Sequence, residues 1–264
     1  MLNITLTSDF GIQSHPVASI KGKLLSAFGQ LNIIDITHTV RPFDLQQGAY
    51  LFKQAYGHFP KDSFHLIYLG LHHRDGKQLL YAYENGQHIF CADNGFMTLL
   101  FDDKPARFFK LTDRISEYDF LHVTDLFLSN IAGLMHGNRS GLELVDVHQI
   151  VVKHPVYATH QNHVLEAQVQ YIDNYGNVIL NLTRHQFEEA ALGRKFRILF
   201  MRDEEINTIS RHYSDVPEGD KLCLFNTSGH LEIAIHNGDA SQLFGFHENG
   251  EKSLLYNRVK IFFE

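Results

Sequence analysis

The spacing of apolar residues changes once along this chain, and that change limits the possible folds more than any other feature. Up to about residue 150, apolar runs typical of strands alternate with amphipathic stretches typical of helices. Beyond it, short alternating strands follow one another through Asn/Gly turns, with only short helical pieces between them. The sequence therefore predicts an N-terminal α/β domain followed by a mainly antiparallel β domain.

The first half predicts a central, mainly parallel sheet. Strands are expected over residues 3–9, 31–37 and 64–71. The last of these is a nearly continuous apolar run, which is typical of a parallel strand covered on both faces. Helices are expected over residues 15–29, 43–59 and 124–137, the third capped by Thr124 or Asp125, and a hairpin is expected to turn at residues 84–86.

The second half predicts two tight hairpins, with turns at residues 173–177 and 226–229. Residues 153–163 are polar, irregular and poor in apolar side chains, as in a linker. We therefore expect an α/β domain over 1–152, a linker over 153–163 and a β domain over 164–264.

Composition excludes several classes of function. The net charge is −7 and no run of lysine or arginine occurs, which argues against nucleic acid or an acidic membrane surface as the main partner. No apolar run approaches the roughly 18–20 residues that span a bilayer, and the first residues lack a signal-peptide pattern, so we expect a cytoplasmic protein. Cys91 and Cys223 lie in strand-like apolar contexts, typical of small buried side chains.

A metal cofactor is not expected. The chain has 18 histidines, but most are scattered singly, and neither an H-E-x-x-H pattern nor a zinc-type cysteine pair occurs.

Four polar clusters follow predicted strands or occupy predicted turns, where ligands bind in open α/β sheets. They are Ser8 to Gly11, Asp35 to His38, Ala92 to Gly95 and Asp173 to Asn177. In the first cluster, a carboxylate can accept bonds from two sugar hydroxyls, and a glycine lets backbone approach a ligand. In the fourth, an asparagine amide can read the edge of a base. Turn or cap formation accounts for each cluster equally well.

In combination and order, the motifs resemble one family. "ITLTSDFG", "DITHTVRPFDLQQGAY", "ADNG", "FLHVTDLF", "YIDNYGNVILNL" and "NTSGHLEIAIHNGDASQLFG" are similar to successive landmarks of the S-adenosylmethionine hydrolases, also called hydroxide adenosyltransferases. These are related to fluorinating and chlorinating enzymes that act on the same substrate. The resemblance covers roughly residues 3–246.

The resemblance implies an α/β domain with a central sheet and a small β-barrel-like C-terminal domain. It also implies a homotrimer whose sites lie between neighbouring subunits, and cleavage of S-adenosylmethionine by water into adenosine and L-methionine without a metal or redox cofactor. The ligand would be S-adenosylmethionine or adenosine.

The same resemblance assigns roles to individual residues. Asp9, with Phe10 and Gly11, matches the family's ribose-binding position, and His122 matches the histidine that holds the attacking water or hydroxide. In the second domain the matches are Asp173 with the methionine ammonium, Asn177 with the adenine, and Thr227 and Ser228 with the methionine carboxylate.

One loop departs from the family pattern. Where the family has V-D-P-G-V-G and then an arginine, the chain has "YLGLHHRDGKQLL", which places Gly70 at the catalytic aspartate and Lys77 or Gln78 at the arginine. "His-Val-Thr" likewise replaces the family's His-Gly-Arg.

Three hypotheses follow. In the first, the site is rebuilt, with His72, its neighbours or Lys77 replacing what is absent. In the second, the protein binds an adenosyl ligand without turning it over. In the third, which we rank lowest, a metal-dependent hydrolase uses His72, His73, Asp75 and His122.

Overall fold

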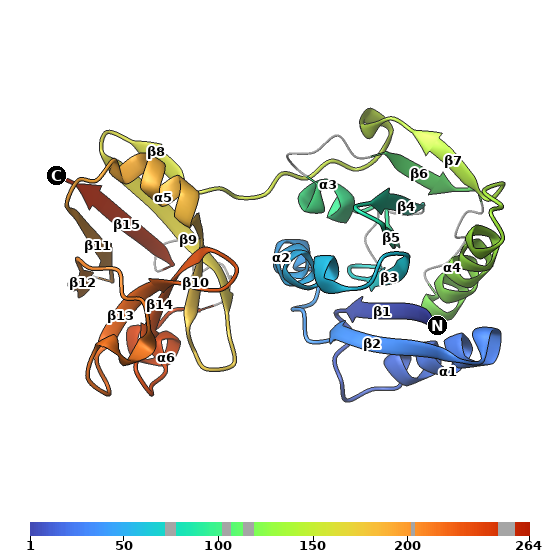
Figure 1. Ribbon diagram of the computed structural model, residues 1–264, viewed down its shortest axis with the longest axis horizontal. Coiled ribbons are helices and arrows are strands. Elements are labelled where there is room, and N and C mark those ends of the chain that lie inside the picture. The colour runs from blue at the N-terminus through green and yellow to red at the C-terminus, as the bar shows by residue number, and fades with distance from the viewer. Residues whose placement is uncertain (72–77, 102–106, 113–118, 202–203, 248–256) are drawn as a thin grey trace. The chain divides into compact units, whose positions relative to one another are not determined.

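The computed structural model describes residues 1–71, 78–101, 107–112, 119–201, 204–247 and 257–264. The chain forms two compact units, Met1–Pro155 and Val156–Glu264, each with its own sheet (Figure 1).

The N-terminal unit is built on a seven-stranded sheet with the order β2-β1-β3-β5-β4-β6-β7. The strands are β1 Leu2–Ser8, β2 Leu31–Thr37, β3 Ser63–Tyr68, β4 Leu79–Glu84, β5 Gln87–Ala92, β6 Phe108–Leu111 and β7 Leu142–Val145.

This sheet is mixed, so the prediction of a mainly parallel sheet was wrong. The β1–β2, β1–β3 and β3–β5 pairings are parallel, and the β5–β4, β4–β6 and β6–β7 pairings are antiparallel. The change of direction begins at the predicted tight hairpin, where Asn85 and Gly86 both have positive φ. That turn reverses the chain between β4 and β5, and antiparallel pairing continues outward from β4.

Helices cover both faces of the sheet. They are α1 Pro16–Phe28, α2 Leu45–Ala55, α3 Phe96–Leu100 and α4 Phe120–Met135, with short 3-10 turns at Tyr56–His58 and Val147–Gln149. Apolar side chains of α1 and α4 pack with Leu66 and Tyr68 on one face, and those of α2 and α3 pack with Ile67 and Leu69 on the other. As predicted, the third strand is buried on both sides.

The expected cap of α4 was wrong. The helix begins four residues earlier than predicted, because the Asp119 side chain accepts a bond from the Leu121 N–H. Thr124 is fully buried inside the helix, where its hydroxyl lies 3.0 Å from the Tyr68 hydroxyl and 2.7 Å from the Phe120 carbonyl oxygen.

The C-terminal unit is an antiparallel sheet with the order β12-β11-β15-β9-β10-β14-β13, and β8 pairs with β9. The strands are β8 Thr159–Gln161, β9 Val164–Ile172, β10 Val178–Thr183, β11 Phe196–Phe200, β12 Glu204–Ile206, β13 Lys221–Phe225, β14 His230–Ile235 and β15 Arg258–Phe263.

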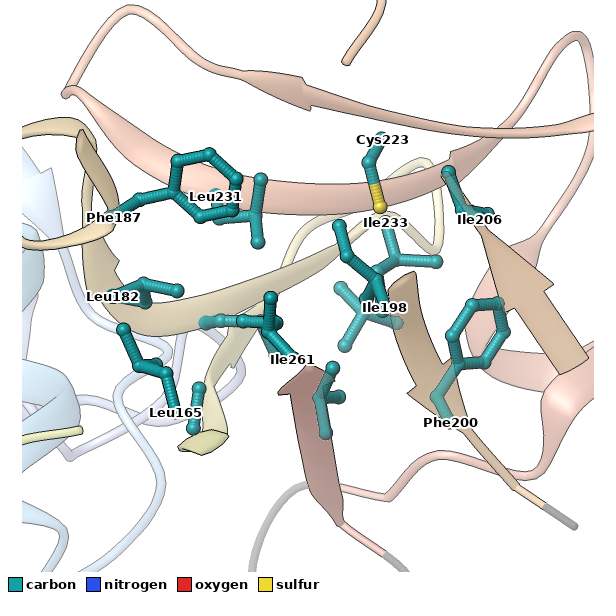
Figure 2. Close-up of a cluster of buried hydrophobic side chains, with 14 of the residues drawn as sticks. Leu165, Leu182, Phe187, Ile198, Phe200, Ile206, Cys223, Leu231, Ile233 and Ile261 are labelled. Atoms are coloured by element: carbon teal, nitrogen blue, oxygen red, sulfur yellow. The ribbon is translucent and has the colours of Figure 1, made fainter. Parts of the chain in front are cut away.

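The sheet curls like half a barrel around a core of Leu, Ile, Val and Phe side chains (Figure 2). Ser210, which follows β12 at one edge, pairs with Leu224 of β13 at the other edge, and Lys221 and Glu204 form an ion pair across the same gap. The predicted hairpins β9–β10 and β13–β14 are both present. The short helices are α5 Arg184–Ala191 and α6 Ala240–Phe244.

Among the helices of the described residues, none combines the length and apolar composition that a transmembrane helix needs.

A buried histidine links stability of the N-terminal unit to pH. His65 on β3 is fully buried, with its Nδ1 2.7 Å from the Thr5 hydroxyl and its Nε2 3.1 Å from Gln87 Oε1. Burial lowers the pKa of His65 to about 4 and outweighs the hydrogen bond to Gln87 Oε1, which acts in the opposite direction. Between about pH 6.5 and pH 4, the unfolded chain therefore binds a proton that the folded chain does not, and stability falls as pH falls.

We expect His65 to contribute a loss of about 2 kcal/mol in the free energy of unfolding between pH 7.5 and pH 5. In a His65→Gln variant this contribution should be absent, although the variant is less stable at pH 7.5. Urea unfolding at the two pH values measures both effects, with exposed His58→Gln as the surface control. An unchanged pH dependence in His65→Gln would refute the assignment.

The β9–β10 turn depends on one glycine. Gly176 has φ +80°, and a Cβ atom there would lie 2.1 Å from Asp239 Oδ1, at the cap of α6. Its carbonyl oxygen also accepts the Ser241 N–H at 2.9 Å.

Gly176→Ala should therefore destabilise the C-terminal unit by roughly 2–4 kcal/mol, combining left-handed backbone strain with steric overlap. Gly193→Ala is a matched control, because Gly193 has φ +76° and open space at the Cβ position. Comparing the thermal unfolding of the two variants separates the cost of backbone strain from the cost of overlap with Asp239. Equal destabilisation would mean that the contact with Asp239 contributes nothing.

Candidate functional site

The carboxyl ends of β1 and β3 lie side by side and form a candidate site in the N-terminal unit. The Asp9 N–H reaches the Tyr68 carbonyl oxygen at 3.4 Å, and the Gly11 N–H donates to the His38 carbonyl oxygen at 2.8 Å. Hydrogen bonds thus connect the "SDFG" turn to the end of β3 and to the segment after β2, at the edge where α/β sheets bind ligands.

The Asp9 carboxylate is held by backbone donors. Its Oδ2 accepts the Gly70 N–H at 3.0 Å and the Phe43 N–H at 3.2 Å. The side chain is half-buried, and within the described residues its Oδ1 has no hydrogen-bond partner. One oxygen is therefore fixed by the protein while the other remains available to a hydroxyl donor.

Both donors come from residues with left-handed backbone. Gly70 has φ +57° and Phe43 has φ +68°. For phenylalanine this conformation costs roughly 1–2 kcal/mol, and strain of this kind clusters at binding and catalytic sites. The Phe43 side chain is 63% exposed beside Asp9. Sequence reasoning missed Phe43, because neither its φ nor its contact 34 residues away has a local signature.

Gly70, which follows β3, lies in a bend held by side-chain hydrogen bonds. The Asn94 side chain donates to the Leu69 carbonyl oxygen at 2.7 Å and accepts the Phe96 N–H at 3.2 Å. Asp93 accepts the Val151 N–H at 2.8 Å. The "ADNG" cluster is therefore accounted for by structural bonds.

The first turn of α4 lies beside the same edge. The Phe10 ring is 5.7 Å from Phe120 and 6.0 Å from Tyr68, measured between centroids. His122 is exposed in this turn. Asp9, Phe10, Gly11 and the turn that carries His122 are therefore brought together, whereas His72 and Lys77 lie outside the described residues.

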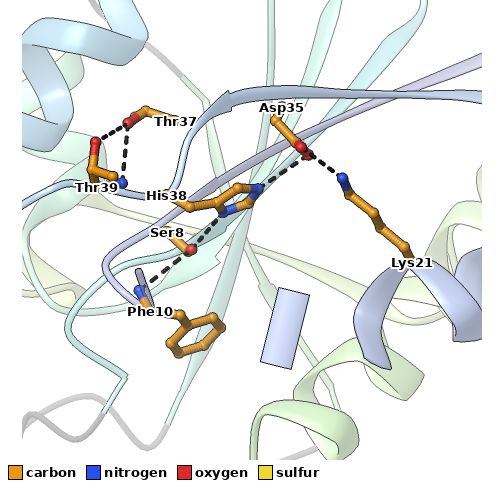
Figure 3. Close-up of polar contacts among 7 residues, drawn as sticks. All are labelled: Ser8, Phe10, Lys21, Asp35, Thr37, His38 and Thr39. Atoms are coloured by element: carbon orange, nitrogen blue, oxygen red, sulfur yellow. Dashed lines mark hydrogen bonds and ion pairs between the residues drawn. The ribbon is translucent and has the colours of Figure 1, made fainter. Parts of the chain in front are cut away.

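The "DITH" cluster forms a polar network rather than a ligand site (Figure 3). His38 Nδ1 lies 2.7 Å from the Ser8 hydroxyl, and Nε2 lies 3.0 Å from Asp35 Oδ1 in an ion-pair contact whose N–H direction is too oblique for a hydrogen bond. Asp35 pairs in turn with Lys21 at 2.6 Å.

A separate candidate site lies at the β9–β10 turn of the C-terminal unit. Asp173 Oδ1 accepts the N–H groups of Tyr175 and Asn177, both at 2.9 Å, and Oδ2 accepts the Asn177 side-chain amide at 3.0 Å. The carboxylate thus organises its own turn. The Asn177 Oδ1 has no partner in the described part of the chain, so it is available to an amino group.

This turn borders a cavity of about 880 Å³, which is within the size range of small-molecule sites. The remaining walls come from the segment after β12 and from the end of β14. The lining residues are Asp173, Tyr175, Asn177, His212, Tyr213, Ser214, Ile235, His236, Asn237, Gly238 and Asp239.

A buried glutamate joins the cavity to the "NTSG" turn. Glu232 is 3% exposed and accepts the Tyr213 hydroxyl at 2.6 Å and the Asn226 amide at 3.1 Å. Burial raises the pKa of Glu232, against the effect of these two hydrogen bonds. Sequence reasoning missed Glu232 and Tyr213, since their pairing spans 19 residues and two different elements.

The "NTSG" turn is ordered by its asparagine. Asn226 Oδ1 accepts the Ser228 N–H and hydroxyl at 3.1 and 2.7 Å, and the His230 N–H at 3.1 Å. Thr227 is exposed and Ser228 is half-buried. Across the described ranges, no group of three or more His, Cys, Asp and Glu side chains is arranged to hold a metal ion.

Both units match known family models. Residues 4–146 match the SAM hydroxide adenosyltransferase N-terminal domain, and residues 167–252 match the SAM hydroxide adenosyltransferase C-terminal domain.

Similar proteins cover nearly the whole chain. A protein of Methanocaldococcus jannaschii named (R)-S-adenosyl-L-methionine hydrolase is 24% identical over 96% of this chain and 95% of its own. A Thermus thermophilus protein of the same name is 25% identical over 97% of this chain and its whole length. A Nocardia brasiliensis fluorinase is 44% identical, over only 17% of this chain and 15% of its own.

A solved structure of a conserved Thermotoga maritima protein has the same fold, with a TM-score of 0.80 and 24% identity over 98% of this chain and 99% of that one. The family resemblance inferred from the motifs is thus confirmed. With matches to both domain models, the chain belongs to the S-adenosylmethionine hydroxide adenosyltransferase family.

Proposed function

We propose that this protein hydrolyses S-adenosylmethionine to adenosine and L-methionine. The proposal is carried by one observation, the Asp9 carboxylate, which two backbone N–H groups hold with one oxygen free, in a chain of this family. Relatives over nearly the full length are named (R)-S-adenosyl-L-methionine hydrolase.

The reaction is a displacement at the ribose C5′ atom. The oxygen of a water molecule forms a bond to C5′ while the C5′–S bond breaks, and the bonding electron pair returns to sulfur. The products are adenosine, L-methionine, whose sulfur is now an uncharged thioether, and one proton. Because sulfonium is a good leaving group, the main requirement is to hold the water and the ribose in line.

In this proposal the ribose hydroxyls bind Asp9 next to Phe10 and Gly11. The free Oδ1 receives one hydroxyl, and the neighbouring backbone is close enough for the sugar because Gly11 has no side chain. His122, exposed at the start of α4, positions the water and accepts its proton. Lys77 or His72 supplies further charge, from the segment outside the described residues.

The second group of contacts lies in the C-terminal unit. We assign the adenine to Asn177, whose Oδ1 is available to the base amino group, and the methionine ammonium to Asp173. Thr227 and Ser228 hold the methionine carboxylate. The cavity beside Asp173 and Asn177 supports this assignment by its size and by the Asp, Asn and His side chains among its lining residues.

A second candidate function is adenosyl binding without turnover. It is favoured by Gly70, which stands where the family pattern has its catalytic aspartate and uses its N–H to hold Asp9. In this case the ribose contacts are intact while the position that activates water is altered.

Two variants separate the candidates, with adenosine release followed by chromatography in the presence and absence of a chelator. If the protein is a hydrolase, His122→Ala should lower turnover roughly 100-fold while affinity changes little, because a proton-transfer group is lost. Asp9→Asn should weaken affinity about 10- to 100-fold, because a charged acceptor is lost. Asp146→Asn, at the cap of an exposed 3-10 turn, is the control.

Absence of turnover together with tight adenosine binding, measured by calorimetry, would reject the hydrolase and support the second candidate. Absence of both would reject each of them. Turnover that the chelator abolishes would instead support a metal-dependent hydrolase.

We also propose a homotrimer in which neighbouring subunits complete each site, as in the family that the chain resembles. Light scattering should then give a mass three times that of the 30.3 kDa chain. A mass that stays at 30.3 kDa across the concentrations used in the activity assay would refute this assembly.

A further inference from the structure

Ser8, His38 and Asp35 have the composition of a hydrolytic triad, but their geometry excludes that role. The Ser8 side chain is 1% exposed and the His38 side chain 6%, so no substrate carbonyl can reach the serine oxygen. The network also ends at Lys21, which pairs with Asp35 on the surface. What the network does contact is the backbone just after Asp9, at the N–H groups of Phe10 and Gly11.

The first contact runs through the imidazole ring. The Ser8 oxygen accepts the Phe10 N–H at 3.4 Å, while its hydroxyl lies 2.7 Å from His38 Nδ1. The Asp35 carboxylate, 3.0 Å from Nε2, favours the tautomer that carries its proton on Nε2. In that tautomer Nδ1 accepts the Ser8 hydroxyl. Ser8 is thereby fixed in one rotamer, with its lone pairs toward Phe10.

The second contact runs through the backbone of the same histidine. The His38 carbonyl oxygen accepts the Gly11 N–H at 2.8 Å. His38 therefore holds Phe10 through Ser8, and holds Gly11 through its own carbonyl oxygen. These bonds cross from the end of β2 to the end of β1, which are neighbouring parallel strands.

The outer end of the network keeps its charge. Although partial burial alone would raise the pKa of Asp35, the hydrogen bond from Lys21 and the nearby His38 ring lower it below its usual value. The carboxylate therefore stays ionised near neutral pH and keeps the His38 ring in one orientation.

We propose that His38 is a positioning residue that holds the Asp9 turn through Ser8 and through its own carbonyl oxygen, and so sets the orientation of the ribose-binding carboxylate. The ligand part of this inference rests on the proposed function. The mechanical part, which concerns the Asp9 turn alone, does not.

The test uses the full-length protein and two variants. His38→Phe keeps a ring of similar size and removes the bond to Ser8. Ser8→Ala removes only one oxygen atom and serves as the milder change. His65→Phe is the matched control, because His65 also joins a hydroxyl at Nδ1 to an oxygen at Nε2 in a buried part of the same sheet.

Two readouts are measured. Amide hydrogen exchange at Phe10 should become at least tenfold faster in His38→Phe and Ser8→Ala, but not in His65→Phe. The KM for S-adenosylmethionine should rise about tenfold in the first two variants with kcat within about twofold. In an Asp9→Asn background, His38→Phe should cause no further rise in KM, because the carboxylate that it orients is gone.

Unchanged exchange at the Phe10 amide in Ser8→Ala and His38→Phe would overturn the mechanical part. A rise in KM that persists fully in the Asp9→Asn background, or that His65→Phe reproduces, would show a general effect on folding and overturn the positioning role. If the wild-type protein neither cleaves S-adenosylmethionine nor binds adenosine, the proposed function fails and takes the ribose role of His38 with it. The exchange data then decide the mechanical part alone.

Discussion

The N-terminal site depends on a single carboxylate held between the ends of two parallel strands. Asp9 directly follows β1, at the edge of the sheet where β3 also ends. Its Oδ2 accepts the N–H groups of Phe43 and Gly70, which lie in the segments after β2 and β3, the two strands that flank β1. Such bonds to an ionised acceptor are stronger than those between neutral groups. Because one oxygen is committed in this way, rotation of the carboxylate is restricted and the other oxygen has a defined direction.

That arrangement requires a rigid base, which the sheet provides. Residues of β3 are buried on both faces, so the strand end that carries Tyr68 is fixed by packing against helices from either side. The Tyr68 hydroxyl joins the Thr124 hydroxyl on α4, and this contact ties the start of α4 to the sheet. The turn that carries His122 is thus built on the same base as Asp9.

Much of this fold was predictable because its signals are local. Three predicted strands of the first half and two hairpins of the second are present, each encoded by periodicity or by a short turn motif. The mixed sheet was not predicted, because β5 inserts between β3 and β4, and strand order depends on contacts distant in sequence. The start of α4 was missed because Thr124 offers the same cap chemistry as Asp119.

The site was predictable only in part, for the same reason. Asp9 stands out in the sequence, since a carboxylate and a glycine follow a strand. The groups that hold Asp9 do not stand out in the sequence. Phe43 is 34 residues away and acts through its backbone N–H in a left-handed conformation. Asp173 shows the opposite case. The motif marks it, but within the described residues its carboxylate bonds only to groups of its own turn.

The difference between these two carboxylates bears on the chemistry. Displacement at C5′ needs little acid assistance, since sulfur leaves as a neutral thioether, and its rate depends on the alignment of the water, C5′ and sulfur. A carboxylate that is already satisfied by its turn contributes mainly charge toward a cationic ligand. A carboxylate with one oxygen fixed and one free contributes direction, because a hydroxyl bound to it inherits the orientation of the backbone. Asp9 meets that requirement, and the His38 network lies where it would stiffen the turn that carries it.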